Sequence, residues 1–259
     1  MVKDDLGKRM KENYEMRART YLTRRMPAVI RLDGCHFHTF CRGFRKPFDT
    51  LFNKAMQETT KFLCQNIQGC VLGYTQSDEI SLLLVDYKDL NSDAWYDGQV
   101  QKICSVSASL ATYAFNKYFN ELYLAQLAEK GEADEYDLIY DKKRKGGAWF
   151  DARCFSIPKE EVVNYFYWRQ IDAERNSANS LAQSLFSHKS LQGLNLKDTI
   201  LKCKEEGNIV WEDLPTVQKR GCCVKRDCSG KWVVVLEIPK FNLDREYIAK
   251  RAFIKEDLD

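Results

Sequence analysis

Apolar residues occur along this chain in two alternating patterns, short continuous runs and longer stretches at helical spacing. Asp49 is a residue type that caps helices, and apolar positions recur every three to four residues after it and again from about Gln99 to Phe119. The short apolar runs predict strands at residues 28–34 (AVIRLDG), 70–75 (CVLGYT), 80–85 (ISLLLV) and 149–157 (WFDARCFSI). The expected order is therefore strand, helix, strand, strand, helix, strand.

That order is the one found in the ferredoxin-like split βαβ unit, which polymerase palms and nucleotidyl cyclases also use. We therefore predict an α+β fold with a palm-like βαββαβ core at residues 27–158, in which both helices cover one face of an antiparallel sheet. Pro158 fits the first turn of a further helix, EEVVNYFYWRQID. Residues 159–259 are expected to form an appended C-terminal α/β region with a helix at LKDTILKCKEEG and a small hairpin around Ser229-Gly230. Residues 1–259 are treated as one unit.

Acidic residues interrupt two of the apolar runs. Asp33 ends the first predicted strand, and Asp78 and Glu79 lie in the polar turn between the second and third. In the predicted topology the first strand and the central hairpin are neighbours, so Asp33 and Asp78 approach each other. Two carboxylates beside Gly34 suit Mg²⁺ ions that bridge phosphate oxygens. Asp, Ser and Gly are also ordinary turn residues, so the spacing alone leaves a metal site and a plain turn both open.

Composition narrows the class of protein. The hydrophobic fraction is 44% and the charged fraction is 30%, as in an ordinary globular protein. No apolar run approaches the roughly 20 residues that span a bilayer, and the N-terminal residues are too polar for a signal peptide, so we expect a cytoplasmic protein without a membrane partner. The ten cysteines lie mostly singly among apolar residues, which predicts reduced thiols. The cluster Cys222, Cys223 and Cys228 lacks the paired spacing of a zinc site.

Positive charge is concentrated in three segments although the net charge is only +3. Residues 1–25 carry eight Lys or Arg against four acids, residues 141–145 read DKKRK, and residues 219–231 read KRGCCVKRDCSGK. A charge run is usually a solvated surface. Together the three segments also permit a polyanionic partner.

Four segments of the chain resemble the tRNA-histidine guanylyltransferase superfamily, whose enzymes add nucleotides to RNA 5′ ends in the 3′-to-5′ direction. They are RLDGCHFHTF, FRKPFD, GYTQSDEISLLL, and FDARCF followed by YWRQID. One such motif would be unspecific, but four in order, within residues 5–190, are specific. The resemblance implies a polymerase-like palm, two Mg²⁺ ions, ATP and GTP or other NTPs as substrates, tRNA bound at its 5′ end and acceptor stem, and a homo-oligomer, typically a tetramer.

The resemblance also implies roles for individual residues. Asp33 and Asp78 would be metal ligands together with the Gly34 carbonyl, and Glu79 would support them as a third catalytic acid. Phe37 would lie under the base and His38 near the sugar or phosphates; without the motif, His36 and His38 would be taken as packing or surface residues. The nucleotide-binding set expected is Arg31, Asp33, Gly34, Cys35, His36, Phe37, His38, Lys46, Ser77, Asp78 and Lys102. The residues expected to contact tRNA are Arg24, Arg25, Lys142, Lys143, Arg144, Lys145, Arg153 and Arg169.

The sequence departs from the eukaryotic guanylyltransferases after WRQ, where those enzymes read HINNLYN and this chain reads ERNSANS at residues 174–180. Cys35 also replaces a basic residue. The first difference resembles the guanylyltransferase-like branch, which prefers templated repair of 5′-truncated tRNAs. We therefore predict a template-dependent 3′-to-5′ polymerase that activates the RNA 5′ end by adenylylation with ATP, after which the 3′-hydroxyl of an NTP attacks.

Three alternative functions remain at this stage. The chain could add one G at position −1 of histidine tRNA, act as a palm-type nucleotidyl cyclase, or bind tRNA without catalysis. The presence of both Asp33 and Asp78 counts against an inactive protein. The motifs that continue past these acids count against a cyclase.

Overall fold

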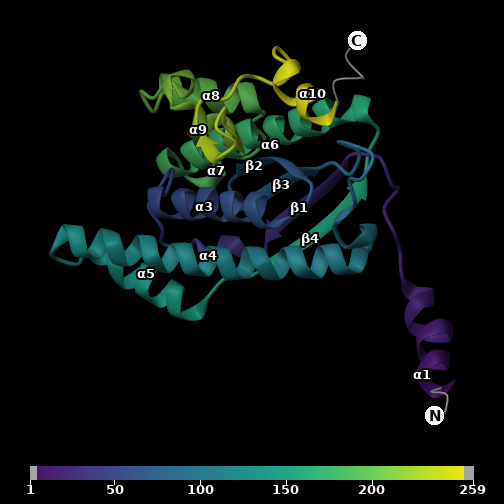
Figure 1. Ribbon diagram of the computed structural model, residues 1–259. Coiled ribbons are helices and arrows are strands. Elements are labelled where there is room, and N and C mark those ends of the chain that lie inside the picture. The colour runs from purple at the N-terminus through teal and green to yellow at the C-terminus, as the bar shows by residue number, and fades with distance from the viewer. Residues whose placement is uncertain (1–4, 254–259) are drawn as a thin grey trace.

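The protein is built on a six-stranded antiparallel sheet with helices on both faces (Figure 1). The computed structural model describes residues 5–253. The strand order is β4-β1-β3-β2-β5-β6, and the four predicted apolar runs form the first four strands of the chain. The strands are β1 (Ala28–Gly34), β2 (Cys70–Gln76), β3 (Glu79–Leu84), β4 (Phe150–Ser156), β5 (Cys222–Arg226) and β6 (Trp232–Val235).

The two predicted core helices, α3 (Thr50–Asn66) and α4 (Val100–Lys130), cover one face of the sheet. Asp49 caps α3 as predicted, since its carboxylate accepts a hydrogen bond from the Phe52 amide at 2.8 Å. The helix α4 continues to Lys130 because further apolar residues extend its stripe and α5 (Glu135–Gly146) packs on that extension. The core on this face is rich in aromatic rings: Phe37 and Phe40 of the short helix α2 (Phe37–Phe40), Phe44, Phe52, Phe115 and Phe119.

The second face of the sheet, for which the predicted core supplied no helix, is covered by α6 (Lys159–Leu185) and α10 (Glu246–Ala252). The central strands require this cover because they bury residues on both sides. Ile30 and Leu82 face α3 and α4, whereas Val29 and Leu83 face α6 and α10. The C-terminal region is therefore part of the main core and adds the predicted hairpin, β5 and β6, to the same sheet.

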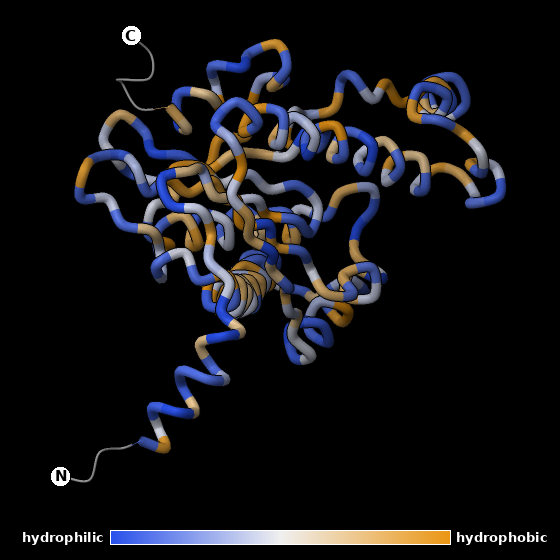
Figure 2. The backbone as a smooth tube through the Cα atoms, turned by 90° about the vertical axis from the view of Figure 1, so that its right-hand side faces the viewer, coloured by the Kyte–Doolittle hydropathy of each residue, from blue (hydrophilic) through white to orange (hydrophobic). Residues whose placement is uncertain are grey.

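The remaining helices lie at the margins of the molecule. A small third cluster packs α8 (Leu196–Glu205) on α6, next to α7 (His188–Leu191) and α9 (Thr216–Arg220). Helix α1 (Asp5–Met10) continues as π and 3₁₀ turns to Ala18 and projects from the body without burying a side chain (Figures 1 and 2). Among residues 5–253, no helix is long and apolar enough to cross a bilayer. All ten cysteines are free thiols.

Candidate functional site

Three strands bring carboxylates together at one end of the sheet. Asp33 on β1 lies opposite Glu79 on β3 and opposite Asp151 on β4. Asp78 is in the turn that precedes β3, and its carbonyl accepts a hydrogen bond from the Gly34 amide at 3.1 Å. The structure thus brings Asp33 and Gly34 next to Asp78 and Glu79. Asp33 and Asp78 are 45 positions apart in the sequence (78 minus 33). Asp151 was missed, although its place in the FDARCF strand could have been found by aligning that strand antiparallel to β1.

The charges of Asp33 and Asp78 are incompletely compensated. Burial raises the pKa of Asp33, and the charge of Asp151 raises it further, against the lowering effect of Arg153 and Arg31. Burial also raises the pKa of Asp78, and the charge of Asp33 adds to it. Carboxylates that repel each other in a partly buried place are stabilised by a cation.

Glu79 differs from these acids because it is neutralised by a buried arginine. Its two carboxylate oxygens accept hydrogen bonds from Arg169, each at 2.7 Å, and Arg169 also bonds Asp172 at 2.8 Å. Arg169 is only 7% exposed. Its assignment to tRNA contacts is therefore wrong, since its guanidinium is already occupied by acids inside the fold. Glu79 and Arg169 fix α6 to the strand that carries Asp78.

The backbone at this end of the sheet adopts unusual conformations. Ser77 (φ 50°) and His36 (φ 58°) are both left-handed without being glycine. In the two-residue hairpin between Gln76 and Glu79, a positive φ at the first turn position is what matches the twist of the strands. Gly34 is required for another reason, because a Cβ there would lie 2.3 Å from the ring of Phe37. Left-handed residues other than glycine, such as Ser77 and His36, are strained, and strained residues concentrate at functional sites.

A pocket of about 380 Å³ opens beside Asp78. It lies between the loop before α3, the hairpin turn, the middle of α6 and the end of α9. Phe37 borders the pocket but is only 2% exposed. The centres of three neighbouring aromatic rings lie 5.0–5.3 Å from the centre of its ring. Core packing therefore accounts for the position of Phe37, and the structure gives no support for its expected place under the nucleotide base. The polar and charged residues that line the pocket include His38, Arg45, Lys46, Asp49, Gln76, Ser77, Asp78, Asn176, Ser177 and Ser180.

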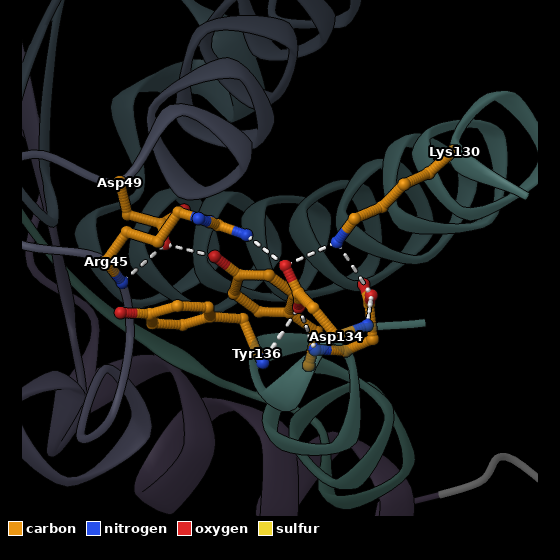
Figure 3. Close-up of polar contacts among 7 residues, drawn as sticks. Arg45, Asp49, Lys130, Asp134 and Tyr136 are labelled. Atoms are coloured by element: carbon orange, nitrogen blue, oxygen red, sulfur yellow. Dashed lines mark hydrogen bonds and ion pairs between the residues drawn. The ribbon is translucent and has the colours of Figure 1, made fainter. Parts of the chain in front are cut away.

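The pocket wall that carries Lys46 is held by a polar network (Figure 3). Arg45 donates to Asp134 at 2.6 Å and lies 4.1 Å from the centre of the Tyr136 ring. Asp49 accepts hydrogen bonds from the Arg45 amide at 3.0 Å and from the Tyr140 hydroxyl at 2.5 Å. The network ties the loop before α3 to the start of α5, so the position of this wall is set by a distant part of the chain.

Several residues expected to bind the nucleotide lie outside the pocket. Arg31 faces α6, with its guanidinium 5.7 Å from the centre of the Trp168 ring. The Cys35 thiol lies 3.9 Å from an Asp151 oxygen. Lys102 is near the start of α4, where its ammonium lies 4.5 Å from the centre of the Tyr96 ring. The structure thus places Lys46 at the pocket but not Lys102.

The cations expected to contact RNA are distributed over separate surfaces. Lys142 is exposed, whereas its neighbours in the DKKRK run bond protein groups: Lys143 donates to the Thr39 carbonyl and Arg144 and Lys145 to Asp141. The other three lie elsewhere: Arg24 pairs with Asp97, Arg153 with Asp151 at 3.4 Å, and Arg25 lines a cleft at the opposite end of the sheet. Residues 1–4 of the basic N-terminal segment are outside the described residues.

Comparisons with known proteins agree with this arrangement. The family model described as tRNAHis guanylyltransferase (Thg1) matches residues 7–158. A solved bacterial tRNA(His) guanylyltransferase (Thg1)-like protein in complex with ATP is 43% identical, with a TM-score of 0.85 over 96% of this chain and 100% of that one. The yeast tRNA(His) guanylyltransferase from Saccharomyces cerevisiae, 21% identical with a TM-score of 0.65 over 90% of this chain and 99% of that one, shares the fold.

Curated relatives extend the same family beyond the matched segment. An uncharacterized protein of Acanthamoeba polyphaga mimivirus, R259, is 31% identical over 87% of this chain and 78% of its own length. The tRNA(His) guanylyltransferase 2 of Arabidopsis thaliana is 26% identical over 76% of this chain, which spans only 35% of that enzyme. With the model match over more than half of its length, this chain belongs to the tRNAHis guanylyltransferase family of nucleotidyltransferases.

Proposed function

We propose that this protein is a template-dependent 3′-to-5′ nucleotidyltransferase that repairs the 5′ end of tRNA. The observation that carries the proposal is the pair Asp33 and Asp78 in a chain of this family, two incompletely compensated carboxylates of which Asp78 lines the pocket. The strand order β4-β1-β3-β2, with α3 and α4 on one face, supports the palm interpretation of residues 27–158.

The acid pair is suited to magnesium. No three His, Cys, Asp or Glu side chains within residues 5–253 form a complete set of metal ligands. Mg²⁺ does not need one, because it keeps waters and binds substrate phosphates alongside one or two carboxylates. Asp33, Asp78 and the Gly34 carbonyl would hold it. When bound, it would lower the pKa of the attacking 3′-hydroxyl and neutralise phosphate charge.

The chain's other residues would position the nucleotide. Lys46 and His38 line the same pocket as Asp78, where they can neutralise a triphosphate. Ser77 presents its hydroxyl beside Asp78, and a hydrogen bond between them lowers the pKa of that acid against the effect of burial. No side-chain nucleophile is needed, since phosphoryl transfer depends on positioning and charge neutralisation.

The segment that departs from the eukaryotic enzymes supports repair over addition of a single G. Its residues Asn176, Ser177 and Ser180 line the pocket, and the Asn176 amide lies 3.4 Å from the Gln76 side-chain oxygen. A difference in sequence at this wall can change which RNA end is accepted. Guanylylation of histidine tRNA remains the second candidate, because relatives at 24–28% identity are named for it.

The test uses two 5′-monophosphorylated RNAs, a full-length histidine tRNA and a tRNA lacking its first nucleotide. Each is incubated with ATP, labelled NTPs and Mg²⁺. Incorporation that follows the base opposite the gap, and changes when that base is changed, supports templated repair. Preferential addition of one G to the histidine tRNA supports the second candidate. Turnover of NTP without RNA would contradict both.

Matched variants attribute the activity to the acid pair. Asp33→Asn and Asp78→Asn remove one charge each at nearly constant volume. Asp93→Asn removes an equivalent charge from an exposed loop and serves as the control. Only the first two should lose incorporation. A homo-oligomer, expected to be a tetramer, and a cytoplasmic location stay predictions that light scattering and cell fractionation would check.

A further inference from the structure

The end of the sheet opposite the acids carries a second concavity, of about 760 Å³, which we call the basic cleft. It lies where β2 begins and β3 ends, beside the end of β5 and of α10. Tyr87 and Phe253 give it an apolar part. Its charged residues are Arg25, Lys88, Asp89, Arg226, Lys250 and Arg251.

The cations of the basic cleft outnumber its acids five to one, since Asp89 is the single acidic residue among the described lining residues. In the part of the chain that the structure describes, none of the five cationic side chains forms an ion pair with a carboxylate. Some exposed cations elsewhere in the molecule are paired, as Arg24 is with Asp97 and Lys145 with Asp141. Among residues 5–253, the cleft is therefore a positive field without paired acids in a concave surface, where field lines are focused.

The cations of the cleft also act on a neighbouring lysine. The pKa of Lys225 is lowered, chiefly by partial burial and then by the charges of Arg251 and Lys250. A cluster of like charges destabilises the fold unless a bound anion neutralises it. Four segments far apart in sequence supply the five cations, so the fold brings them together.

The position of the basic cleft relates it to the acid pair. Asp78 and Val85 are at opposite ends of β3, which at about 3.3 Å per residue places the two sites roughly 20 Å apart. That span corresponds to about six base pairs of a nucleic-acid helix at ~3.4 Å each. Because helices cover both faces of β3, an RNA whose 5′ end lies at Asp78 would run over the surface and would need at least this length to reach the cleft.

We propose that the basic cleft binds the phosphate backbone of the RNA substrate, away from the 5′ end where the nucleotide is added. The proposal rests on the proposed function for the identity of the RNA. Five cations spread around an open cleft suit successive phosphates of a polynucleotide better than the compact triphosphate of one nucleotide, which a few converging groups would hold. It also assigns a role to α10, whose sequence indicated none, and to β5, which lies in one of the three basic segments that permit a polyanionic partner.

The experiment compares wild type with the Lys88→Ala/Lys250→Ala double variant, since both lysines are exposed and their removal leaves the core intact. Binding of a full-length 5′-monophosphorylated tRNA is measured between 50 and 200 mM salt. Nucleotide addition is measured on a hairpin whose stem of about three base pairs is too short to reach the cleft. We expect tRNA affinity to fall about tenfold and the slope of log affinity against log salt to decrease by roughly one to two. Addition to the hairpin should stay within twofold.

The matched control is Lys189→Ala/Lys197→Ala, which removes the same charge from exposed positions on α7 and α8. It should bind tRNA as wild type does. Equal loss in both double variants, or no loss in either, would overturn the proposal, as would a raised half-saturating ATP or GTP concentration in the cleft variant. If wild type bound tRNA tightly but added nothing to either RNA, the proposed function would fail while the binding result still decided the role of the cleft.

Discussion

The two ends of the central sheet carry opposite charges, and each is incompletely neutralised. At one end Asp33 and Asp78 are partly buried, so burial itself raises the pKa of both. At the other end four cations of the basic cleft are exposed to solvent and to the ions in it: Arg25, Lys88, Arg226 and Lys250. The proposed binding of a cation by the partly buried acids would therefore be screened little by salt. The proposed attraction of RNA by the exposed cations of the basic cleft would be screened strongly.

The largest expected effect contrasts the neutralised acid Glu79 with its unneutralised neighbours. Arg169→Met leaves Glu79 buried without its partner, and we expect a loss of about 3–5 kcal/mol in the free energy of unfolding, measured with urea. The double variant Glu79→Gln/Arg169→Met should recover part of that loss, because no buried charge remains unpaired. A loss below about 1 kcal/mol in the single variant would show that this pair does not anchor α6.

The second effect tests whether the acid pair lowers stability in exchange for activity. Asp78→Asn should reduce incorporation by roughly 10²- to 10³-fold. It should also raise Tm at pH 7, because the folded-state pKa of Asp78 is above its unfolded value and the ionised form destabilises the fold there. The gain should shrink as the pH falls towards 4, where protonation relieves the same repulsion in wild type. An unchanged Tm at both pH values would contradict the electrostatic account.

The third prediction compares a lysine that lines the pocket with one that lies outside it. Lys46→Ala should raise KM for the incoming NTP by about tenfold, since a charged contact to phosphate is lost. Lys102→Ala serves as the comparison because Lys102 lies against Tyr96 and does not line the pocket. The family resemblance assigned both lysines to the triphosphate. Equal increases in KM would favour the resemblance over the geometry.

The smallest effect concerns the network in Figure 3 that supports the pocket wall. Asp134→Asn keeps a side chain that can cap α5 but removes the charge that pairs with Arg45 and Lys130. These ion pairs hold the pKa of Asp134 well below its usual range. Their stabilisation is therefore present above about pH 4 and lost as the pH falls further. We expect a Tm lower by a few degrees at pH 7, with the difference shrinking below pH 4.

Much of the sheet could be predicted because strands and helices differ in hydrophobic period. The first four strands, the cap at Asp49 and the β5-β6 hairpin all follow from that pattern. The cover on the second face did not follow, since a continuous apolar run such as ISLLLV does not say what packs on each side. Only the structure shows Leu82 and Leu83 facing different helices.

The candidate site was partly predictable for a similar reason. The topology alone placed Asp33 beside Asp78, because neighbouring strands bring together residues that are distant in sequence. Burial and pairing could not be predicted from residue type. In the sequence Arg169 looks like any surface arginine, but in the structure it forms ion pairs with Glu79 and Asp172. Asp151 lies next to Asp33 only because of the register in which β4 pairs with β1. Arg45 and Asp134 likewise meet only in three dimensions.

The turn of Ser77 and Asp78 has a consequence for how such chains can evolve. Side chains on a strand alternate between faces, so adding or deleting one residue in this turn would move β3 out of register and exchange the residues of its two faces. Glu79 would then point away from Arg169, and Leu82 would point towards α6 instead of towards α3 and α4. Among relatives, insertions and deletions should therefore accumulate in other loops and leave the length of this turn unchanged.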